Sequence, residues 1–300
     1  MENLVIEGKK AHGRLLGEKG KRILFDVLTH MILIFFALLV LIPFYIILIT
    51  SVKTNLEASN PEFSLFPKNG FHFESYKNVL SLHPLIGRSI LKGFLTTIWI
   101  NILPTVVGLF MSAMSAFALA KVKFRGRNFI FSVMMLTMMI PSIITLTPSY
   151  LIYSELDWIG TPLPLILPGL FGSGSCLFFM RQYFLGLPDE LIEAARIDGL
   201  KNFGVYVRIV LPLSKPALIS QFLIIFIGRY NDYLGPLLYL ANSDYYTLQL
   251  ALWNNLGTFI NDWPSIMAGC VVALAPLLLI YLCMQKYFLK GIAISSGIKG

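Results

Sequence analysis

Six apolar stretches, each long enough to cross a lipid bilayer, constrain this chain more than any other feature of its sequence. A transmembrane helix needs about 20 predominantly apolar residues. The six stretches lie near residues 24–50, 90–120, 128–152, 163–184, 217–240 and 263–287. Prolines such as Pro104 and Pro141 fall inside them, which neighbouring helices can tolerate. The pattern predicts an all-α membrane protein with six transmembrane helices.

The composition supports lipid as the solvent for much of this chain. Charged residues make up 13% of it and hydrophobic residues 56%, whereas soluble domains carry about 25% charged residues. The net charge of +8 does not indicate nucleic-acid binding, because basic loops on one side of a membrane follow from topology alone. The apolar run Met31–Thr50 follows a basic N-terminus. It is too long for a signal peptide and lacks a cleavage site, so it is predicted to be an uncleaved first span.

The distribution of Lys and Arg predicts the orientation. Eighteen of the 24 basic residues lie in segments 1–22, 121–127, 181–216 and 286–300, and five lie in segment 51–92. Loops rich in Lys and Arg stay on the cytoplasmic side. Both termini are therefore expected to be cytoplasmic.

The chain divides into four parts on this basis. They are a cytoplasmic N-terminal tail (1–22), the first transmembrane helix with an outer loop (23–89), a core transmembrane domain (90–287) and a cytoplasmic C-terminal tail (288–300). The core contains a polar cytoplasmic loop, residues 186–216, and no internal repeat or separate soluble domain is visible.

The loop 186–216 predicts a helix, a glycine stop and a second helix. Pro188 suits a helix start, Asp189 and Glu190 suit the positive helix end, and Gly199 suits a left-handed stop. Leu191, Ala194 and Ala195 would form a small, smooth surface for a partner protein. The second helix is expected over 200–210, with one side formed by Phe203, Tyr206, Val207 and Val210. From the residues alone, an amphipathic loop lying on the membrane is an equal alternative.

The loop also carries a spaced motif. It consists of Glu193, Ala194, Ala195, Asp198, Gly199, Ile209, Leu211 and Pro212. This pattern resembles the EAA motif in membrane subunits of binding-protein-dependent ABC importers. Three further segments look like the corresponding parts of maltose-type, carbohydrate-specific permeases: Asn231–Leu240, Tyr246–Leu252 and the C-terminal Gln285–Gly300. The likeness covers roughly residues 90–300. One departure is that Arg229 or Tyr230 stands where relatives often have Trp.

The resemblance implies a type I importer fold in a bacterial or archaeal cytoplasmic membrane. It implies four partners: a second permease subunit, two ATPase subunits that bind ATP and Mg²⁺, and an extracytoplasmic binding protein that delivers a sugar. It places Glu193 in a cleft of the ATPase, where it passes motion to the spans. The C-terminal tail Ile294–Gly300 would reach toward the ATPase dimer, and the loop 241–262 would contact the binding protein, with Trp253, Asn254 and Asn255 at its tip.

A charged group inside a bilayer is a functional candidate by default. Arg229 and Asp232 lie three residues apart in the fifth span, on one helix face. With Tyr230 and Asn231 they are candidates to line the sugar path. The alternative is an internal Arg229–Asp232 ion pair that fixes helix packing.

No catalytic or metal-binding residues are predicted. The chain has no phosphate loop, nucleophile elbow or zinc motif, so ATP hydrolysis and its cofactors are assigned to partner subunits. Within the importer class, a non-sugar solute such as an amino acid, peptide or phosphoester is the alternative substrate. A secondary transporter would need intramembrane carboxylates and inverted repeats, and a membrane enzyme would need convergent polar residues.

Overall fold

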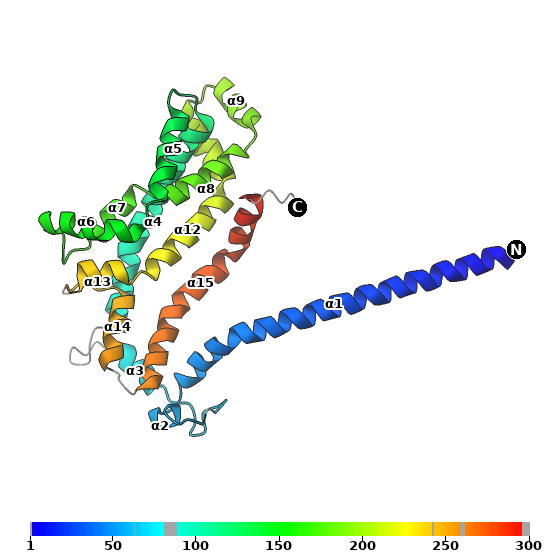
Figure 1. Cartoon of the computed structure of the whole chain (residues 1–300), viewed down its shortest axis with the longest axis horizontal. Coiled ribbons are helices and arrows are strands. Elements are labelled where there is room, and N and C mark those ends of the chain that lie inside the picture. The colour runs from blue at the N-terminus through cyan, green and yellow to red at the C-terminus, as the bar shows by residue number, and fades with distance from the viewer. Residues whose placement is uncertain (1, 63, 81–88, 242, 259–261, 296–300) are drawn as a thin grey trace.

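The computed structural model describes the backbone of residues 2–62, 64–80, 89–241, 243–258 and 262–295. Side chains are described between residues 20 and 286 of these ranges, apart from 21 and 255–258. All regular elements in this part of the chain are helical (Figure 1).

The chain up to residue 185 contributes eight of the labelled helices, and the rest of it contributes the remaining ones. The first eight are α1 (Glu2–Thr50), α2 (Asn55–Ala58), α3 (Glu74–Leu80), α4 (Ile90–Lys121), α5 (Arg127–Met138), α6 (Ser142–Glu155), α7 (Leu163–Leu170) and α8 (Gly174–Leu185). After residue 185 come α9 (Asp189–Ile197), α10 (Asn202–Val205), the π-helical turn η2 (Tyr206–Val210), α11 (Leu211–Leu213), α12 (Lys215–Tyr230), α13 (Leu234–Leu240), α14 (Leu248–Thr258) and α15 (Trp263–Ser295).

Helix α4 lies at the centre of the bundle. It packs against α7, α8, α12 and α14, and small residues let the backbones approach closely. A Cβ added to Gly108 would lie 2.2 Å from the carbonyl oxygen of Gly169, and one added to Gly172 would lie 2.1 Å from the Ser112 hydroxyl. The glycines at this interface therefore allow the backbones to pack closely.

Four helical segments are long and apolar enough to span a membrane by themselves: 22–50, 90–121, 163–185 and 263–286. Two further candidates are helix pairs with a sharp bend, so the described chain has between four and six spans. These segments agree with four of the six predicted ranges. The first bent pair, 127–155, falls where the third span was expected. The second, 202–230, covers only 217–230 of the fifth predicted range and begins inside the predicted loop 186–216.

The third predicted span is a bent pair rather than one straight helix. Helix α5 ends at Met138, α6 starts at Ser142, and the two axes are inclined by 91°. Pro141 stands directly before α6. Because proline lacks an N–H donor and disfavours helical geometry in the residue before it, the helix breaks at this point.

The fifth predicted span, 217–240, ends earlier than expected. Helix α12 stops at Tyr230, and the separate α13 begins at Leu234. The Asp232 carboxylate accepts a hydrogen bond from the Gly235 amide at 3.2 Å, near the start of α13. A polar cap of this kind favours a new helix start over continuation of the old one.

Helix α1 is one continuous helix that leaves the bundle and stretches away from the other helices (Figure 1). Its helical backbone begins at Glu2, so the segment expected as a tail continues the first span. Apolar side chains along 23–48, including Phe35 and Leu39, are exposed. A surface of this kind requires cover by lipid or by another protein chain.

Candidate functional site

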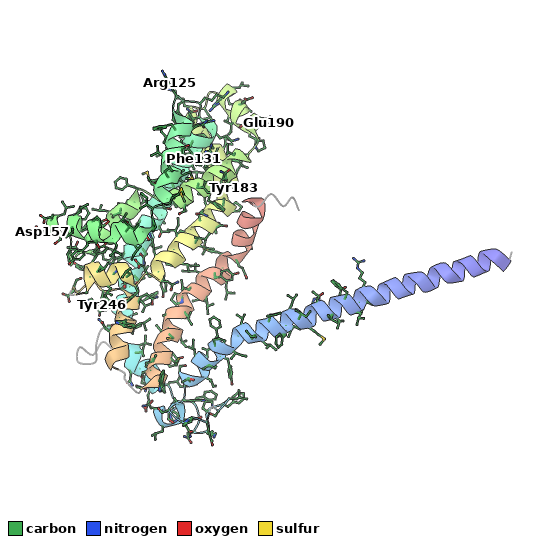
Figure 2. All side chains as sticks on the ribbon, viewed as in Figure 1. Arg125, Phe131, Asp157, Tyr183, Glu190 and Tyr246 are labelled. Atoms are coloured by element: carbon green, nitrogen blue, oxygen red, sulfur yellow. The ribbon has the colours of Figure 1, made fainter. Side chains whose placement is uncertain are left out.

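The loop 186–216 lies at one end of the bundle. Helix α9 occupies the tip of this end, next to the loop that joins α4 to α5 (Figure 1). Glu190 on α9 and Arg125 on that neighbouring loop are both found there, whereas Tyr246 lies toward the opposite end (Figure 2). The loop is thus placed to meet a partner approaching along the bundle axis.

Both ends of α9 follow from its sequence. Asp189 and Glu190 occupy its first turn, where the positive end of the helix dipole favours carboxylates. At its other end Gly199 has φ +85°, and the Leu200 amide donates to the Ala195 carbonyl oxygen at 3.0 Å. This is the hydrogen bond of a glycine-terminated helix, so the predicted stop at Gly199 is confirmed.

The two faces of α9 have different surroundings. Ile192 and Ala195 are buried, with Ala195 only 5% exposed, and they belong to the apolar core between α4, α8 and the loop. Glu193 and Ala194 are exposed. The prediction that both alanines face a partner is therefore wrong for Ala195, because this residue packs the helix onto the bundle.

The Glu193 carboxylate has no hydrogen bond or ion pair within the described part of the chain. It is exposed, as is Asp198 at the C-terminal end of the helix. Unpaired carboxylates on a fixed helix face can bind basic groups of another protein.

The predicted second helix, 200–210, is replaced by α10 and the π-helical turn η2. A π-helical turn changes the angular spacing of side chains. As a result Tyr206 and Val210 are buried while Phe203 and Val207 are exposed, and the four do not share one side. The remaining motif residues continue this arrangement: Ile209 and Leu211 are partly buried against the core and Pro212 is exposed.

Three basic side chains tie the loop and its neighbours to the last turn of α4. The Lys121 ammonium, with its side chain 6% exposed, lies 2.6 Å from Asp189 Oδ1 and donates to the Leu187 carbonyl oxygen at 2.7 Å. Arg196 Nη2 donates to the Lys121 carbonyl oxygen at 3.4 Å. Arg181 Nε donates to the Leu119 carbonyl oxygen at 3.3 Å. These contacts are called the α4 anchor below.

The α4 anchor was missed from the sequence. Lys121 was counted only as a basic loop residue, and nothing in the spacing links it to Asp189, 68 positions away. A lysine on the last turn of a span was the available signal, since such cations favour helix C-termini and carbonyl oxygens.

The ion pair favours the charged form of the Asp189 carboxyl. The Lys121 ammonium, first through its hydrogen bond and then through its charge, lowers the pKa of the exposed Asp189 carboxyl below its usual value. A lowered carboxyl pKa stabilises the folded state above the ordinary Asp value of about 3.9. That contribution disappears only as the pH falls through the lowered pKa.

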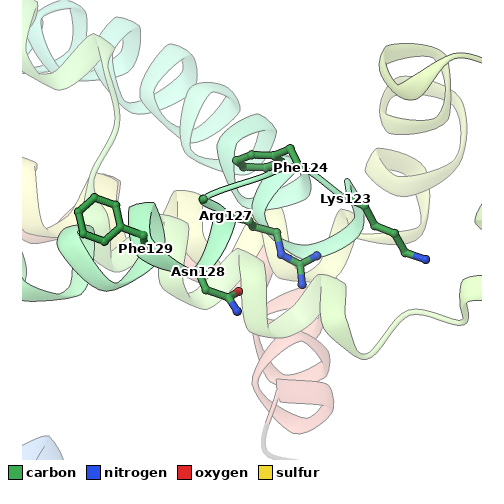
Figure 3. Close-up of a pocket in the computed structure, with 6 residues that line it drawn as sticks. Lys123, Phe124, Arg127, Asn128 and Phe129 are labelled. Carbon is green, nitrogen blue, oxygen red and sulfur yellow. The ribbon is translucent and has the colours of Figure 1, made fainter.

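An open hollow of about 290 Å³ lies between α4 and α5. It is lined by Lys123, Phe124, Gly126, Arg127, Asn128 and Phe129 (Figure 3). Arg127 Nη1 donates to the Val122 carbonyl oxygen at 3.4 Å, and the hollow is otherwise open to solvent. It adds positive charge to the end of the molecule where the carboxylates of α9 are exposed.

The residues predicted to line a sugar path do not form one group. Arg229 Nη1 donates to the Leu165 carbonyl oxygen of α7 at 3.1 Å, and Asp232 caps α13 instead. Within the described residues no ion pair joins Arg229 to Asp232. Because α12 ends at Tyr230, these two residues do not share a helix face either.

A cavity of about 60 Å³ lies beside Arg229, next to α4 and α7. Its lining includes Pro104, Gly108, Gly169 and Gly172. A Cβ on Gly169 would lie 2.0 Å from Arg229 Nη2, so this glycine makes room for the guanidinium. The arrangement supports a packing role for Arg229 and leaves space for solvent beside it.

The two residues between Arg229 and Asp232 have different environments. Tyr230 is 1% exposed and donates through its hydroxyl to the Ala273 carbonyl oxygen of α15 at 3.0 Å. That burial contradicts a path-lining role in the described conformation. Asn231 is exposed, and its side-chain oxygen lies 3.5 Å from Gln249 Nε2, so it keeps the predicted access to a solute.

The predicted binding-protein contact lies on α14. Trp253 is exposed, and its ring centroid is 5.6 Å from that of Tyr233. Asn254 is also exposed, while the side chain of Asn255 lies outside the described residues. Residues 296–300 of the predicted ATPase-facing tail are likewise outside them, so both contacts stay predictions.

No group of three or more His, Cys, Asp or Glu side chains that could hold a metal ion occurs among the described residues. What the site offers is a rigid helix with exposed carboxylates, rather than a set of reacting groups.

The chain is similar to known membrane transport proteins over most of its length. Residues 105–294 match the family model described as binding-protein-dependent transport system inner membrane component. The arabinooligosaccharides transport system permease protein AraQ of Bacillus subtilis is 33% identical over 88% of this chain and 92% of its own. The sn-glycerol-3-phosphate transport system permease protein UgpE of Brucella abortus is 33% identical over 89% and 95%.

A solved structure shows the same fold. It is the crystal structure of a bacterial ABC transporter involved in the import of the acidic polysaccharide alginate. The match has a TM-score of 0.75 at 24% identity and covers 88% of this chain and 96% of the other.

The contact between Gly169 and Arg229 yields a test of the role of Arg229. Gly169→Ala should displace the guanidinium from the Leu165 carbonyl and lower the thermal stability of the purified subunit, because the new Cβ overlaps Arg229 and also lies 2.8 Å from the Pro104 Cβ. In an Arg229→Ala background the loss caused by Gly169→Ala should shrink by about 1 kcal/mol. Gly228→Ala is the control, since nothing lies within 4 Å of its added Cβ.

Additive losses in this cycle would show that Gly169 and Arg229 are not coupled. If Arg229→Ala left stability unchanged but raised the KM for sugar uptake, Arg229 would line the path instead of fixing the packing.

Proposed function

Because the chain belongs to the family of binding-protein-dependent transport system inner membrane components, we propose that it is a membrane-spanning subunit of an ABC importer for a sugar or oligosaccharide. The observation that carries the mechanism is helix α9. It is fixed to the end of α4 on one side and exposes the unpaired Glu193 carboxylate on the other.

The partners of this subunit follow from the way such importers work. A second permease subunit would complete the sugar path and cover part of the apolar surface of α1. Two ATPase subunits would bind ATP and Mg²⁺ and receive α9, and an extracytoplasmic binding protein would deliver the sugar. The chain itself supplies contacts and no chemical step.

Coupling requires that ATP changes the contacts made by α9. Closure of the ATPase dimer on ATP would move the cleft that holds Glu193, and the rest of the bundle would follow through α4. A ligand shifts a conformational equilibrium only through contacts that differ between the two states. Glu193, like Glu190 on the same helix, is exposed and has no bond within the described part of the chain, so it is free to make such contacts.

A phosphoester is the second candidate substrate. The support is the similarity to glycerol-3-phosphate permeases, which is as extensive as the similarity to the oligosaccharide permease. Competition between an arabinooligosaccharide and glycerol 3-phosphate for uptake by the reconstituted importer distinguishes the two.

Glu193→Lys should abolish uptake and weaken attachment of the ATPase subunits, because the reversed charge repels the basic groups that the carboxylate is expected to meet. Co-purification of the ATPase with the membrane subunit measures attachment. Glu155→Lys, the same change at an exposed position at the end of α6, should leave attachment intact. Normal uptake by the Glu193 variant would remove α9 as the coupling element.

The proposed topology has six spans with both termini and α9 in the cytoplasm, supported by the Lys and Arg distribution. In a background where Cys176, Cys270 and Cys283 are replaced by Ala, a membrane-impermeant maleimide should label Glu155→Cys in intact cells. It should label Glu193→Cys only in inverted vesicles. The reverse pattern would place α9 outside the cell.

A further inference from the structure

We propose that Lys121 is a positioning residue that makes α4 the first transmembrane helix to move with α9, an inference that rests on the proposed role of this subunit in an ABC importer. Two routes lead from α9 into the membrane. One follows the chain forward through α10 and η2 to α12. The other crosses directly to the last turn of α4.

The route to α4 is short and rigid. Lys121 holds the start of α9 through Asp189 and Leu187, at 2.6 and 2.7 Å. Arg196, in the last turn of α9, reaches the Lys121 carbonyl oxygen at 3.4 Å. Both ends of α9 are therefore tied to one residue at the end of α4.

An apolar seam supports the same connection. Ile192 and Ala195 of α9 share a buried core with Phe117 and Ala120 of α4. Interiors packed in this way transmit displacement with little compression. The charged contacts fix the position of α9 along this seam, and the apolar contacts resist separation from it.

The route along the chain contains several bends. It passes Gly199 at φ +85°, the π-helical turn η2, and a bend of 80° at Ser214 between the η2 segment and α12. The η2 turn also bonds to α4, because the Tyr206 hydroxyl donates to the Phe110 carbonyl oxygen at 3.3 Å. Even this part of the loop thus delivers force to α4 before it reaches α12.

Helix α4 can distribute the motion further. It packs against α7, α8, α12 and α14, and its glycine contacts with α7 leave no space for slip at Gly108. A displacement of its cytoplasmic end would therefore displace each of these helices. Without Lys121, a force applied at Glu193 would rotate α9 on its apolar contact with α4 and would not displace α4.

The test uses the complete importer in liposomes and measures sugar uptake and ATP hydrolysis in the same preparation. Lys121→Gln should retain ATPase attachment and hydrolysis but lower the sugar imported per ATP by roughly tenfold, within the usual range of coupling effects. Lys121→Arg should restore most of the ratio because the cation is kept. Asp189→Asn, an exposed change that keeps the Leu187 contact, should lower the ratio less.

Arg125→Gln is the matched control, since Arg125 lies in the loop just beyond α4, is exposed, and makes no bond to α9 in the described chain. It should leave the ratio unchanged. A normal ratio in Lys121→Gln would refute the inference. Equal loss in Lys121→Gln and Lys121→Arg would also refute it, because only the general packing would then matter.

Two outcomes remain separable from failure of the proposed function. Should Lys121→Gln fail to assemble, Asp189→Asn decides: a normal ratio in that variant refutes the role of the ion pair. If Glu193→Lys also leaves uptake normal, the proposed function itself fails. If Glu193→Lys abolishes uptake but Lys121→Gln and Asp189→Asn both import the normal amount of sugar per ATP, the proposed function is supported and only the route through α4 is refuted.

Discussion

Close packing around α4 is the constraint on which the rest of the structure depends. Lipid tails are as apolar as the helix surfaces, so the hydrophobic effect does not drive helices together inside a bilayer. Van der Waals contact between small residues helps to hold them together. Gly108 and Gly172 let α4 meet the α7–α8 region at backbone distance. Helix α9 is fixed to this centre, and Lys121 makes the contact at the C-terminal end of α4. In the proposed importer, the exposed carboxylate of α9 can transmit motion because the other face of the helix is packed on the bundle.

Much of the fold could be predicted from sequence because the bilayer imposes simple requirements. A long apolar run in a bilayer favours a helix, and the predicted ranges agree closely with the four candidate spans that lack a sharp bend. The third and fifth spans were less well predicted, because a hydropathy pattern does not show where the helix axis bends. Pro141 and Ser214 lie at bends of 91° and 80°, although the segments on both sides remain apolar. The early end of α12 at Tyr230 depends on the cap that Asp232 provides, which a hydropathy pattern cannot show.

The candidate site was predictable where local rules apply and unpredictable where distant residues meet. The helix start near Pro188 and the stop at Gly199 are local, and the motif spacing identified the loop. The inward turn of Ala195 and the burial of Tyr206 depend on where α4 and α8 lie. Lys121 bonds to Leu187, and Arg229 bonds to Leu165. Each of these contacts joins residues more than 60 positions apart. Contacts at this separation become visible only when the chain is folded.

The central claim is that α9 and the C-terminal end of α4 move as one unit when ATP binds to the proposed importer. Spin labels test it directly by pulsed electron resonance, in the assembled importer with Cys176 and Cys270 replaced. One pair joins Asp198→Cys to Phe124→Cys, just beyond α4, with Cys283 also replaced. The other joins Asp198→Cys to the native exposed Cys283 of α15. We expect ATP to leave the first distance unchanged and to shift the second. A change in the first distance as large as that in the second would contradict the claim.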